Sequence, residues 1–254
     1  MCHCEKDAIK SLNKLLEFYI NDSSGKHLKK ANLISYWLKD YVRLINFEET
    51  FDPTRNIAYK RGNIVKLNSG FNIGSEYGGL HYAIVLDNKN DHNSPVLTVI
   101  PLTSVKESKS IHNNSVDLGN EIYRLLKLKY DTILKSLKDE SDEIEKMISI
   151  FNELIHTSRF TLDELKKLDA ADHLKYTLDQ KSEHNLEAQS ELKKIGEEIS
   201  RMKPGSIALV NQITTISKMR IFDPRNLRGV LAGVSLSEES MEKINQKVKE
   251  LYIF

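Results

Sequence analysis

Three side chains that can act on a phosphate ester lie close together in the sequence, within residues 61–103. They are Glu76, His81 and Thr103. A histidine has an ordinary pKa of about 6.5, so it can accept or donate a proton near neutral pH. A threonine hydroxyl can donate a hydrogen bond to a phosphate oxygen, and a carboxylate can orient the histidine or bind the edge of a base. These residue types favour proton transfer beside a bound phosphate.

Each of the three residues also has a purely structural interpretation. His81 could be a half-buried strand histidine bonded to a carbonyl, and Thr103 could satisfy its own loop at a strand end. Glu76 could be a solvated loop acid. Residue type leaves both interpretations open, so the elements that would position these side chains have to be considered.

Those elements form a predicted β region at residues 61–119. Apolar, strand-like runs are joined there by connections rich in glycine and asparagine. The runs are Ile64–Leu67, Tyr82–Leu86, Val96–Leu102 and Ser115–Leu118. The three polar residues then lie at strand ends or loop edges. The glycines of NIGSEYGG, the segment that contains Glu76, permit a mobile loop over a substrate.

Residues 1–60 are predicted to form a helical pair followed by a linker. Apolar residues recur there at helical spacing in two stripes, which are separated by a break at residues 21–25. The stripes contain Ile9, Leu12, Leu16 and Tyr19, and then Leu33, Trp37, Tyr41 and Ile45. We expect the aromatic residues of this block to be packed core rather than a base-stacking surface.

Residues 120–203 change character, with no proline and a single glycine, Gly196. Apolar residues follow alternating steps of four and three, which is the heptad spacing of a coiled coil, and only Glu140 interrupts them. They are Leu126, Tyr130, Ile133, Leu137, Ile144, Met147, Phe151 and Leu154. Thr161 and Glu164 offer a capping box for a return helix. The looser stripe of that helix contains Leu174, Leu178, Leu192, Ile199 and Met202. The block is predicted to be an antiparallel helical hairpin.

Residues 204–254 return to β character in the segment GSIALV, which is followed by a polar, loop-like segment, NQITTISKMRIFDP. Ser237 then opens a final amphipathic helix. The strands before and after the hairpin are too few for separate cores. We therefore predict an α+β fold in which one β domain, residues 61–119 and 204–254, is interrupted by a helical insertion, residues 120–203. Such an insertion is tolerated because closing a long loop costs little more than closing a short one.

Composition excludes several classes of protein. The 254 residues carry a net charge of +1 and are 40% hydrophobic, which is typical of a soluble globular protein. No apolar stretch reaches the length of about 18 residues that a membrane span needs, and no signal peptide is expected. Cys2, His3 and Cys4 offer three soft ligands at a chain end without a fourth, so we expect no metal and no other cofactor. Two cysteines fit a reducing cytoplasm.

Four segments in sequence order resemble the MazF/PemK toxin family: RGNIVKLN, GSEYGGLHYAIVLDN, SPVLTVIPLTS and GSIALVNQITTISKMRI. The resemblance covers about residues 61–119 and 204–254. It implies a small SH3-like β-barrel that forms a homodimer, acts in the cytoplasm and is paired with an antitoxin protein. It also implies metal-independent cleavage of single-stranded RNA, in which the ribose 2′-hydroxyl attacks the adjacent phosphate. The products are a 2′,3′-cyclic phosphate and a 5′-hydroxyl end.

The resemblance assigns roles to the candidate residues. The family's usual threonine, at the end of the third strand, falls on Thr103. Its usual arginine, in a pattern like GGxRP, is replaced in Gly78-Gly79-Leu80-His81-Tyr82. Arginine is a permanent cation, whereas histidine can exchange a proton. We therefore hypothesise that His81 is the general acid or base, that Thr103 anchors the phosphate and that Glu76 assists.

Further residues are expected to bind the RNA. Arg61, Lys218 and Arg220 are the basic residues placed to face its phosphates, with Ser75 and Gln212 as hydrogen-bonding neighbours. Thr214 stands where many members of the family carry arginine. Each basic residue could equally be a surface charge.

Two alternative functions remain open on the sequence. A barrel of this family that has lost catalysis would bind protein or nucleic acid, and a related toxin fold poisons gyrase. The helical insertion could extend a dimer interface, form a wall of the RNA groove or bind the antitoxin, because its heptads show only that it packs against something helical.

Overall fold

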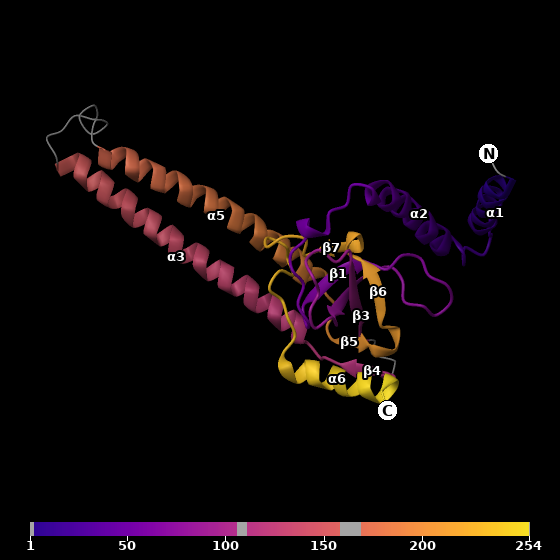
Figure 1. Cartoon of the computed structure of the whole chain (residues 1–254). Coiled ribbons are helices and arrows are strands. Elements are labelled where there is room, and N and C mark those ends of the chain that lie inside the picture. The colour runs from indigo at the N-terminus through magenta and orange to yellow at the C-terminus, as the bar shows by residue number, and fades with distance from the viewer. Residues whose placement is uncertain (1–2, 106–110, 158–168, 254) are drawn as a thin grey trace.

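The computed structural model describes residues 3–105, 111–157 and 169–253. In this part of the chain an antiparallel sheet is combined with five α-helices (Figure 1). The helices are α1 (His3–Ile20), α2 (Leu28–Glu48), α3 (Glu121–Thr157), α5 (Asp169–Arg201) and α6 (Glu238–Tyr252). The strands are β1 (Ile64–Asn68), β2 (Leu80–Val85), β3 (Val96–Ser104), β4 (Ser115–Asp117), β5 (Ser206–Leu209), β6 (Thr214–Ser217) and β7 (Ile221–Asp223). Three 3₁₀ turns are η1 (Pro53–Arg55), η2 (Val210–Gln212) and η3 (Lys218–Arg220). None of the described helices is long and apolar enough to cross a membrane.

The strands pair in the order β4-β5-β3-β2-β1-β7, and β6 also pairs with β3. All four strands expected in residues 61–119 form, as does the strand in GSIALV. The segment after it was expected to be a polar loop, and that prediction is wrong, because β6 and β7 form there. Each of these short strands buries one apolar residue, Ile216 in β6 and Ile221 in β7. One apolar residue in a segment was too weak a pattern to predict a strand.

The expected α+β class is confirmed, but the sheet is not closed into a barrel. β6 and β7 are consecutive strands joined by η3, and no pairing between them, or between β4 and β7, is present in the described residues. β3 is the strand around which the rest is arranged. It pairs with β2 along one edge and with β6 and then β5 along the other.

Proline explains why β5 and β6 are separate strands. The carbonyl of Thr98 faces β2, since it accepts a hydrogen bond from Leu86. Because backbone groups alternate between the two edges, Pro101 faces the edge shared by β5 and β6, where it has no N–H to donate. The pairing on that edge is interrupted there by η2. This break opens space beside the sheet for a pocket.

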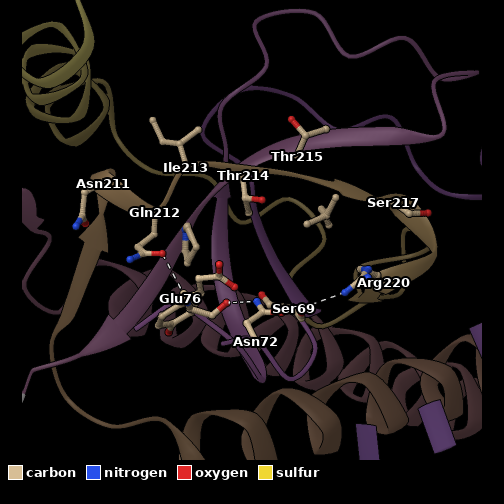
Figure 2. A pocket seen from close by; sticks show the side chains of 13 residues that line it. Ser69, Asn72, Glu76, Asn211, Gln212, Ile213, Thr214, Thr215, Ser217 and Arg220 are labelled. Atoms are coloured by element: carbon tan, nitrogen blue, oxygen red, sulfur yellow. Dashed lines mark hydrogen bonds between the residues drawn. The ribbon is translucent and has the colours of Figure 1, made fainter. Parts of the chain in front are cut away.

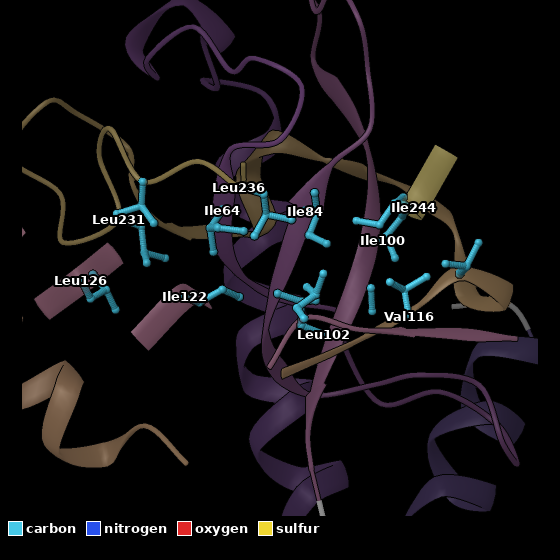
Figure 3. Packing of buried hydrophobic residues seen from close by; sticks show 14 residues of the cluster. Ile64, Ile84, Ile100, Leu102, Val116, Ile122, Leu126, Leu231, Leu236 and Ile244 are labelled. Carbon is cyan, nitrogen blue, oxygen red and sulfur yellow. The ribbon is translucent and has the colours of Figure 1, made fainter. Parts of the chain in front are cut away.

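Both faces of the sheet are buried, which accounts for the nearly continuous apolar runs of its strands. One face packs against the start of α3 and against α6, through residues such as Ile84, Ile122 and Ile244 (Figure 3). The other face forms a second core. It contains Tyr59, Val65, Leu67, Ala83, Val85, Leu97, Val99, Ile216 and Ile221.

Helices α3 and α5 run side by side as a long antiparallel hairpin that projects from the sheet (Figure 1). Lys129 pairs with Glu191 near the sheet, at 3.0 Å, and Glu143 pairs with Lys181 farther out, at 2.7 Å. The predicted seam of α3 is its least exposed face, and Glu140, at the interrupted position, pairs with His184 of α5. The side chains of Phe151 and Leu154, and the capping box at 161–164, lie outside the described part of the chain.

The N-terminal helical pair forms, but its packing differs from the prediction. Helix α2 buries Ala31 and Ile34, whereas Leu33, Tyr41 and Ile45 of the predicted stripe are 49%, 45% and 46% exposed. The expectation that the aromatic residues form packed core is wrong for several of them. Examples are Phe18 and Tyr36, which are 64% and 72% exposed. The helices were predicted correctly from their apolar spacing, but only a narrow face of α2, which contains Ala31 and Ile34, is buried.

Candidate functional site

His81 and Thr103 lie at two neighbouring strand ends and line one space there. The paired register of β2 and β3 ends with Ala83 opposite Pro101. Because side chains alternate along a strand, His81 points to the same face as Ala83, and Thr103 to the same face as Pro101. The structure therefore brings together the two residues for which proton transfer and phosphate binding were hypothesised.

Tyr77 joins these two side chains from the loop before β2. Its ring centroid lies 4.4 Å from that of His81, with the two planes inclined by 45°. Its hydroxyl donates to the carbonyl oxygen of Leu102, and its oxygen accepts a hydrogen bond from the hydroxyl of Thr103. Burial raises the pKa of the Tyr77 phenol, so it keeps its proton near neutral pH and remains a hydrogen-bond donor.

The surroundings of His81 favour its neutral form. Burial lowers the pKa of the imidazole below its ordinary value of 6.5, and a hydrogen bond with the backbone of Gly78 opposes this only in part. Nε2 lies beside Gly79, where an added Cβ would be 3.4 Å away. A neutral imidazole has one ring nitrogen that can accept a proton. His81 is therefore suited to act as a base at neutral pH.

A space that we call the cationic hollow lies between the ends of β2 and β3 and the end of α5. Its volume is about 390 Å³. His81 and Thr103 line it from the sheet, while Glu198, Arg201 and Lys203 line it from α5 and the residues that follow. The helical insertion is therefore part of the wall of the candidate site.

Glu198 fixes the end of α5 to the sheet. Its carboxylate accepts hydrogen bonds from the ammonium group of Lys66 and from the hydroxyl of Tyr82. Burial alone would raise the pKa of Glu198, but the two hydrogen bonds and the charge of Lys66 outweigh it and lower that pKa. Glu198 is therefore ionised at neutral pH, and its carboxylate is occupied by these two partners.

A second space, the polar pocket, lies beside β6 at the break between β5 and β6. Its volume is about 500 Å³. Figure 2 shows Gln212 and Arg220 toward opposite ends of the pocket, with Glu76 and Asn72 between them. The full lining is Ser69, Asn72, Glu76, Tyr77, Pro101, Asn211, Gln212, Ile213, Thr214, Thr215, Ile216, Ser217 and Arg220. Since Tyr77 lines this pocket and packs against His81, the two spaces meet at the Tyr77–His81 contact.

The polar pocket offers hydrogen-bonding groups with little charge. Gln212 holds the loop before β2, since its Oε1 accepts from the backbone N–H of Tyr77 at 3.3 Å. The Ser69 hydroxyl oxygen is buried without a hydrogen-bond partner in the described residues. Arg220 donates to the carbonyl of Ser69 at 3.0 Å, and its guanidinium lies 5.1 Å from the ring centroid of Trp37 in α2. Amides, hydroxyls, one cation and the carboxylate of Glu76 are a suitable set for binding base edges.

The expected site residues divide between these two spaces. Glu76 lines the polar pocket, where its Oε2 accepts from the backbone N–H of Ile73 at 3.3 Å, and no hydrogen bond to His81 is recorded for it within the described ranges. Gln212 and Arg220 line the same pocket. Ser75 is exposed beside it and its carbonyl faces the Gln212 amide at 3.5 Å.

Arg61 and Lys218 lie in neither space. Arg61 donates to the carbonyl of Leu86 and to the side chain of Asn245, so it ties the sheet to α6. Lys218 is only 1% exposed, and its ammonium group donates to the carbonyls of Asp91 and His92. The structure thus gives these two residues structural partners in place of the expected phosphate contacts.

Several residues of the site were missed from the sequence. Tyr77 had no signal beyond its position in the glycine-rich loop. Lys66, Glu198, Arg201 and Lys203 come from a strand and from an insertion whose register against the sheet is set by tertiary packing. No sequence pattern could have placed the end of the insertion beside His81.

Metal ligation was also considered. Within residues 3–105, 111–157 and 169–253, no group of three or more histidine, cysteine, aspartate or glutamate side chains is arranged to hold a metal ion. Cys2, one of the three soft ligands at the N-terminus, lies outside this part of the chain.

The fold and the site together define an α+β protein in which a histidine, His81, lies at the start of β2 between the polar pocket and the cationic hollow, in surroundings that favour its neutral form. Residues 60–137 match the family described as PemK-like, MazF-like toxin of type II toxin-antitoxin system. The match spans β1 to β4 and the first part of α3, and it includes Glu76, His81 and Thr103. It confirms the resemblance over residues 61–119, while the segment 204–254 lies outside it, and it supports a MazF/PemK family toxin, which implies an antitoxin as partner. No curated protein matches the chain.

Proposed function

We propose that this protein is the toxin component of a toxin–antitoxin system and acts as a metal-independent endoribonuclease on single-stranded RNA. The observation that carries the proposal is that His81 and Thr103 line one space at the ends of β2 and β3, inside the segment that matches the toxin family. A base and a hydroxyl donor at one place are groups that cleavage by an internal hydroxyl needs.

The reaction requires few groups. Neutral His81 accepts the proton of the ribose 2′-hydroxyl while that oxygen attacks the adjacent phosphorus. The bond from phosphorus to the 5′ oxygen breaks, and the imidazolium returns the proton to the leaving oxygen. The Thr103 hydroxyl, which donates to Tyr77 in the free protein, turns to donate to a phosphate oxygen when RNA binds, and the neighbouring Tyr77 keeps the Thr103 side chain at the strand end. The products are a 2′,3′-cyclic phosphate and a 5′-hydroxyl end.

The polar pocket gives this enzyme a place to bind bases. Glu76, Asn72 and Gln212 offer acceptors and donors to base edges, and Arg220 at the far end meets a phosphate or a base. Ser75 is available at the rim. In this arrangement Glu76 contributes to recognition of the RNA, since its carboxylate is directed to the loop and the pocket rather than bonded to His81.

The remaining expectations belong to the same proposal. The open sheet is a variant of the family's SH3-like barrel, because Ile216 of β6 and Ile221 of β7 close over one core with β1, β2 and β3. The protein acts on cytoplasmic RNA as a homodimer, and a cognate antitoxin restrains it. We propose three units: the helical pair and linker of residues 1–60, the β domain formed by residues 61–119 and 204–254, and the helical insertion of residues 120–203.

Cleavage of a defined RNA tests the function. Purified protein is incubated with a mixed-sequence single-stranded RNA in excess EDTA, and the product ends are analysed. The wild type is expected to give fragments with cyclic phosphate and 5′-hydroxyl ends. His81→Ala is expected to lower the rate by about 10²- to 10⁴-fold, the usual contribution of a general acid or base. Thr103→Val, which keeps the shape and removes the hydroxyl, is expected to lower it less.

His112→Ala is the matched control, because His112 is exposed outside both spaces. It should cleave like the wild type. If the wild type binds RNA and leaves it intact, the protein is a binding module of the same fold. Growth arrest with altered DNA supercoiling and intact RNA would indicate a gyrase poison instead.

A further inference from the structure

We propose that the cationic hollow is a phosphate-binding subsite for the RNA, and that the helical insertion supplies its cations, Arg201 and Lys203. The proposal rests on the proposed function and assigns part of the substrate to this surface. It makes the insertion a part of the active site rather than an appendage.

The position of the hollow connects it to the reaction. His81 and Thr103 lie at its rim on the strand ends, whereas Lys66 and Tyr82 point to the opposite face of the sheet from His81, so a phosphate held in the hollow lies around the strand ends from the one that His81 and Thr103 act on. Neighbouring phosphates of a single strand are one nucleotide apart, so one strand that passes round the strand ends can occupy both positions. The polar pocket, on the other side of Tyr77, then receives the bases.

The wall from the insertion is held in a defined place. Glu198 is bonded to Lys66 and Tyr82 of the sheet, and only 13% of its side chain is exposed. One residue past α5, Met202 packs against the hydrophobic core, and Gly205 donates its N–H to the side chain of Asn120 at 2.7 Å. Arg201 and Lys203 flank Met202, so the same anchors position their backbone.

The charges of the hollow favour an anion. Lys66, Arg201 and Lys203 face a single carboxylate, Glu198, and that carboxylate is already bonded to Lys66. Arg201 has a solvent-exposed pair with Glu197, at 3.4 Å, which contributes little, and its charge also acts on Glu198. In the described part of the chain no ion-pair partner is recorded for Lys203. The C-terminal end of a helix carries a partial negative charge, so the attraction must come from these side chains.

The test measures binding separately from cleavage. The probe is a fluorescent single-stranded oligonucleotide of mixed sequence with 2′-O-methyl riboses, which cannot be cleaved because the attacking hydroxyl is blocked. Binding to the full-length Arg201→Ala/Lys203→Ala variant is compared with the wild type over a range of salt concentrations. Removing the two cations that hold this phosphate should weaken binding about tenfold and reduce the salt slope by roughly 0.7, the value for one phosphate of a single strand.

The matched control is Lys193→Ala/Lys194→Ala, which removes the same charge from exposed positions of α5 outside the hollow. It should bind like the wild type, and circular dichroism should show that both variants are folded. Equal affinity and equal salt slope for wild type and Arg201→Ala/Lys203→Ala would overturn the subsite, and so would failure of the wild type to bind the probe. Cleavage by the wild type with an unaffected double variant would leave the nuclease function standing without the subsite. Weaker binding by the double variant, in a protein that does not cleave RNA, would support the subsite and remove the nuclease function.

Discussion

The ring of Tyr77 packs against the ring of His81, and the hydroxyl of the same tyrosine reaches the backbone of Leu102 and the side chain of Thr103. One residue of the glycine-rich loop therefore contacts both groups that the proposed reaction uses. The loop and the strand end are thereby coupled, because movement of the loop would withdraw Tyr77 from His81 and Thr103 together.

Replacing Tyr77 with phenylalanine tests this coupling. The ring contact with His81 stays, while the donor to Leu102 and the partner of Thr103 are removed. A net loss of about 1–3 kcal/mol in the free energy of unfolding is expected for the two hydrogen bonds. A decrease in kcat/KM on the order of tenfold, equivalent to about 1.4 kcal/mol, is expected from poorer positioning of Thr103. Tyr36→Phe, at a position that is 72% exposed, is the control and should change neither quantity.

The pH dependence of cleavage tests the role of His81. Burial lowers its pKa below 6.5, so the neutral, proton-accepting form persists to a lower pH than for a free histidine. The kcat/KM of the wild type should therefore reach its plateau at a lower pH than a free histidine would give, and decrease as the pH falls through the lowered pKa. Residual cleavage by His81→Ala should lack this acidic limb. An acidic limb centred above pH 6.5, or one retained in the variant, would contradict the assignment.

Strands and helices could be predicted where their apolar residues are regularly spaced. They could not be predicted where only tertiary contacts determine whether a strand forms. The runs at Ile64 and Val96 and the heptads of α3 each bury a continuous surface, so their period is visible in the sequence. The short strands β6 and β7 have one buried apolar residue each, Ile216 and Ile221, which gives too weak a pattern. Closure of the sheet could not be inferred, because it depends on pairing between such short edges.

The candidate site was predictable only in part, for a related reason. His81 and Thr103 could be proposed because strand ends are visible in the sequence. Lys218 and Arg61 looked like surface cations, but their partners are backbone carbonyls and a helix residue that only the fold brings near. Glu198 and Lys66 form a pair although the hairpin separates them in the sequence, and no pattern in the sequence shows that the two residues meet.

Glu198→Gln tests the anchor between α5 and the sheet. The substitution keeps the shape of the side chain and removes the charge that Lys66 pairs with in a mostly buried position. We expect a loss of about 1–3 kcal/mol in the free energy of unfolding at pH 7, as for hydrogen bonds to a charged group. Urea titration measures it. Glu197→Gln, whose partner Arg201 is 72% exposed, is the matched control and should change stability by less than about 1 kcal/mol.

The same variant predicts a dependence on pH. The folded pKa of Glu198 lies below 4.5, its value in the unfolded chain, so its contribution is complete above pH 4.5 and is lost as the pH falls through the folded pKa. The difference in stability between the wild type and Glu198→Gln should therefore be constant above pH 4.5 and shrink below it. A difference that stays constant down to pH 2 would show that the carboxylate is not the source of the stabilisation.

Gly70→Ala tests how α2 is attached beside the polar pocket. Gly70 has a φ of +91°, and a Cβ there would lie 2.8 Å from a ring carbon of Trp37, whose ring also stacks on Arg220. Both the left-handed backbone and the clash oppose a side chain, so we expect a loss of about 2–4 kcal/mol in the free energy of unfolding. Weaker RNA binding should accompany it, because Arg220 loses its stacked partner.

A double-mutant cycle separates the two causes. Gly74→Ala is the control for backbone conformation, since Gly74 also has a positive φ, +63°, but no atom within 4 Å of an added Cβ. It should cost only about 1 kcal/mol. In a Trp37→Ala background the clash is absent, so Gly70→Ala should then cost little more than Gly74→Ala, with a small excess because +91° is farther from the left-handed helical region. If the cost of Gly70→Ala is the same with and without the indole ring, Trp37 does not pack on Gly70 in solution and α2 is not held at the pocket.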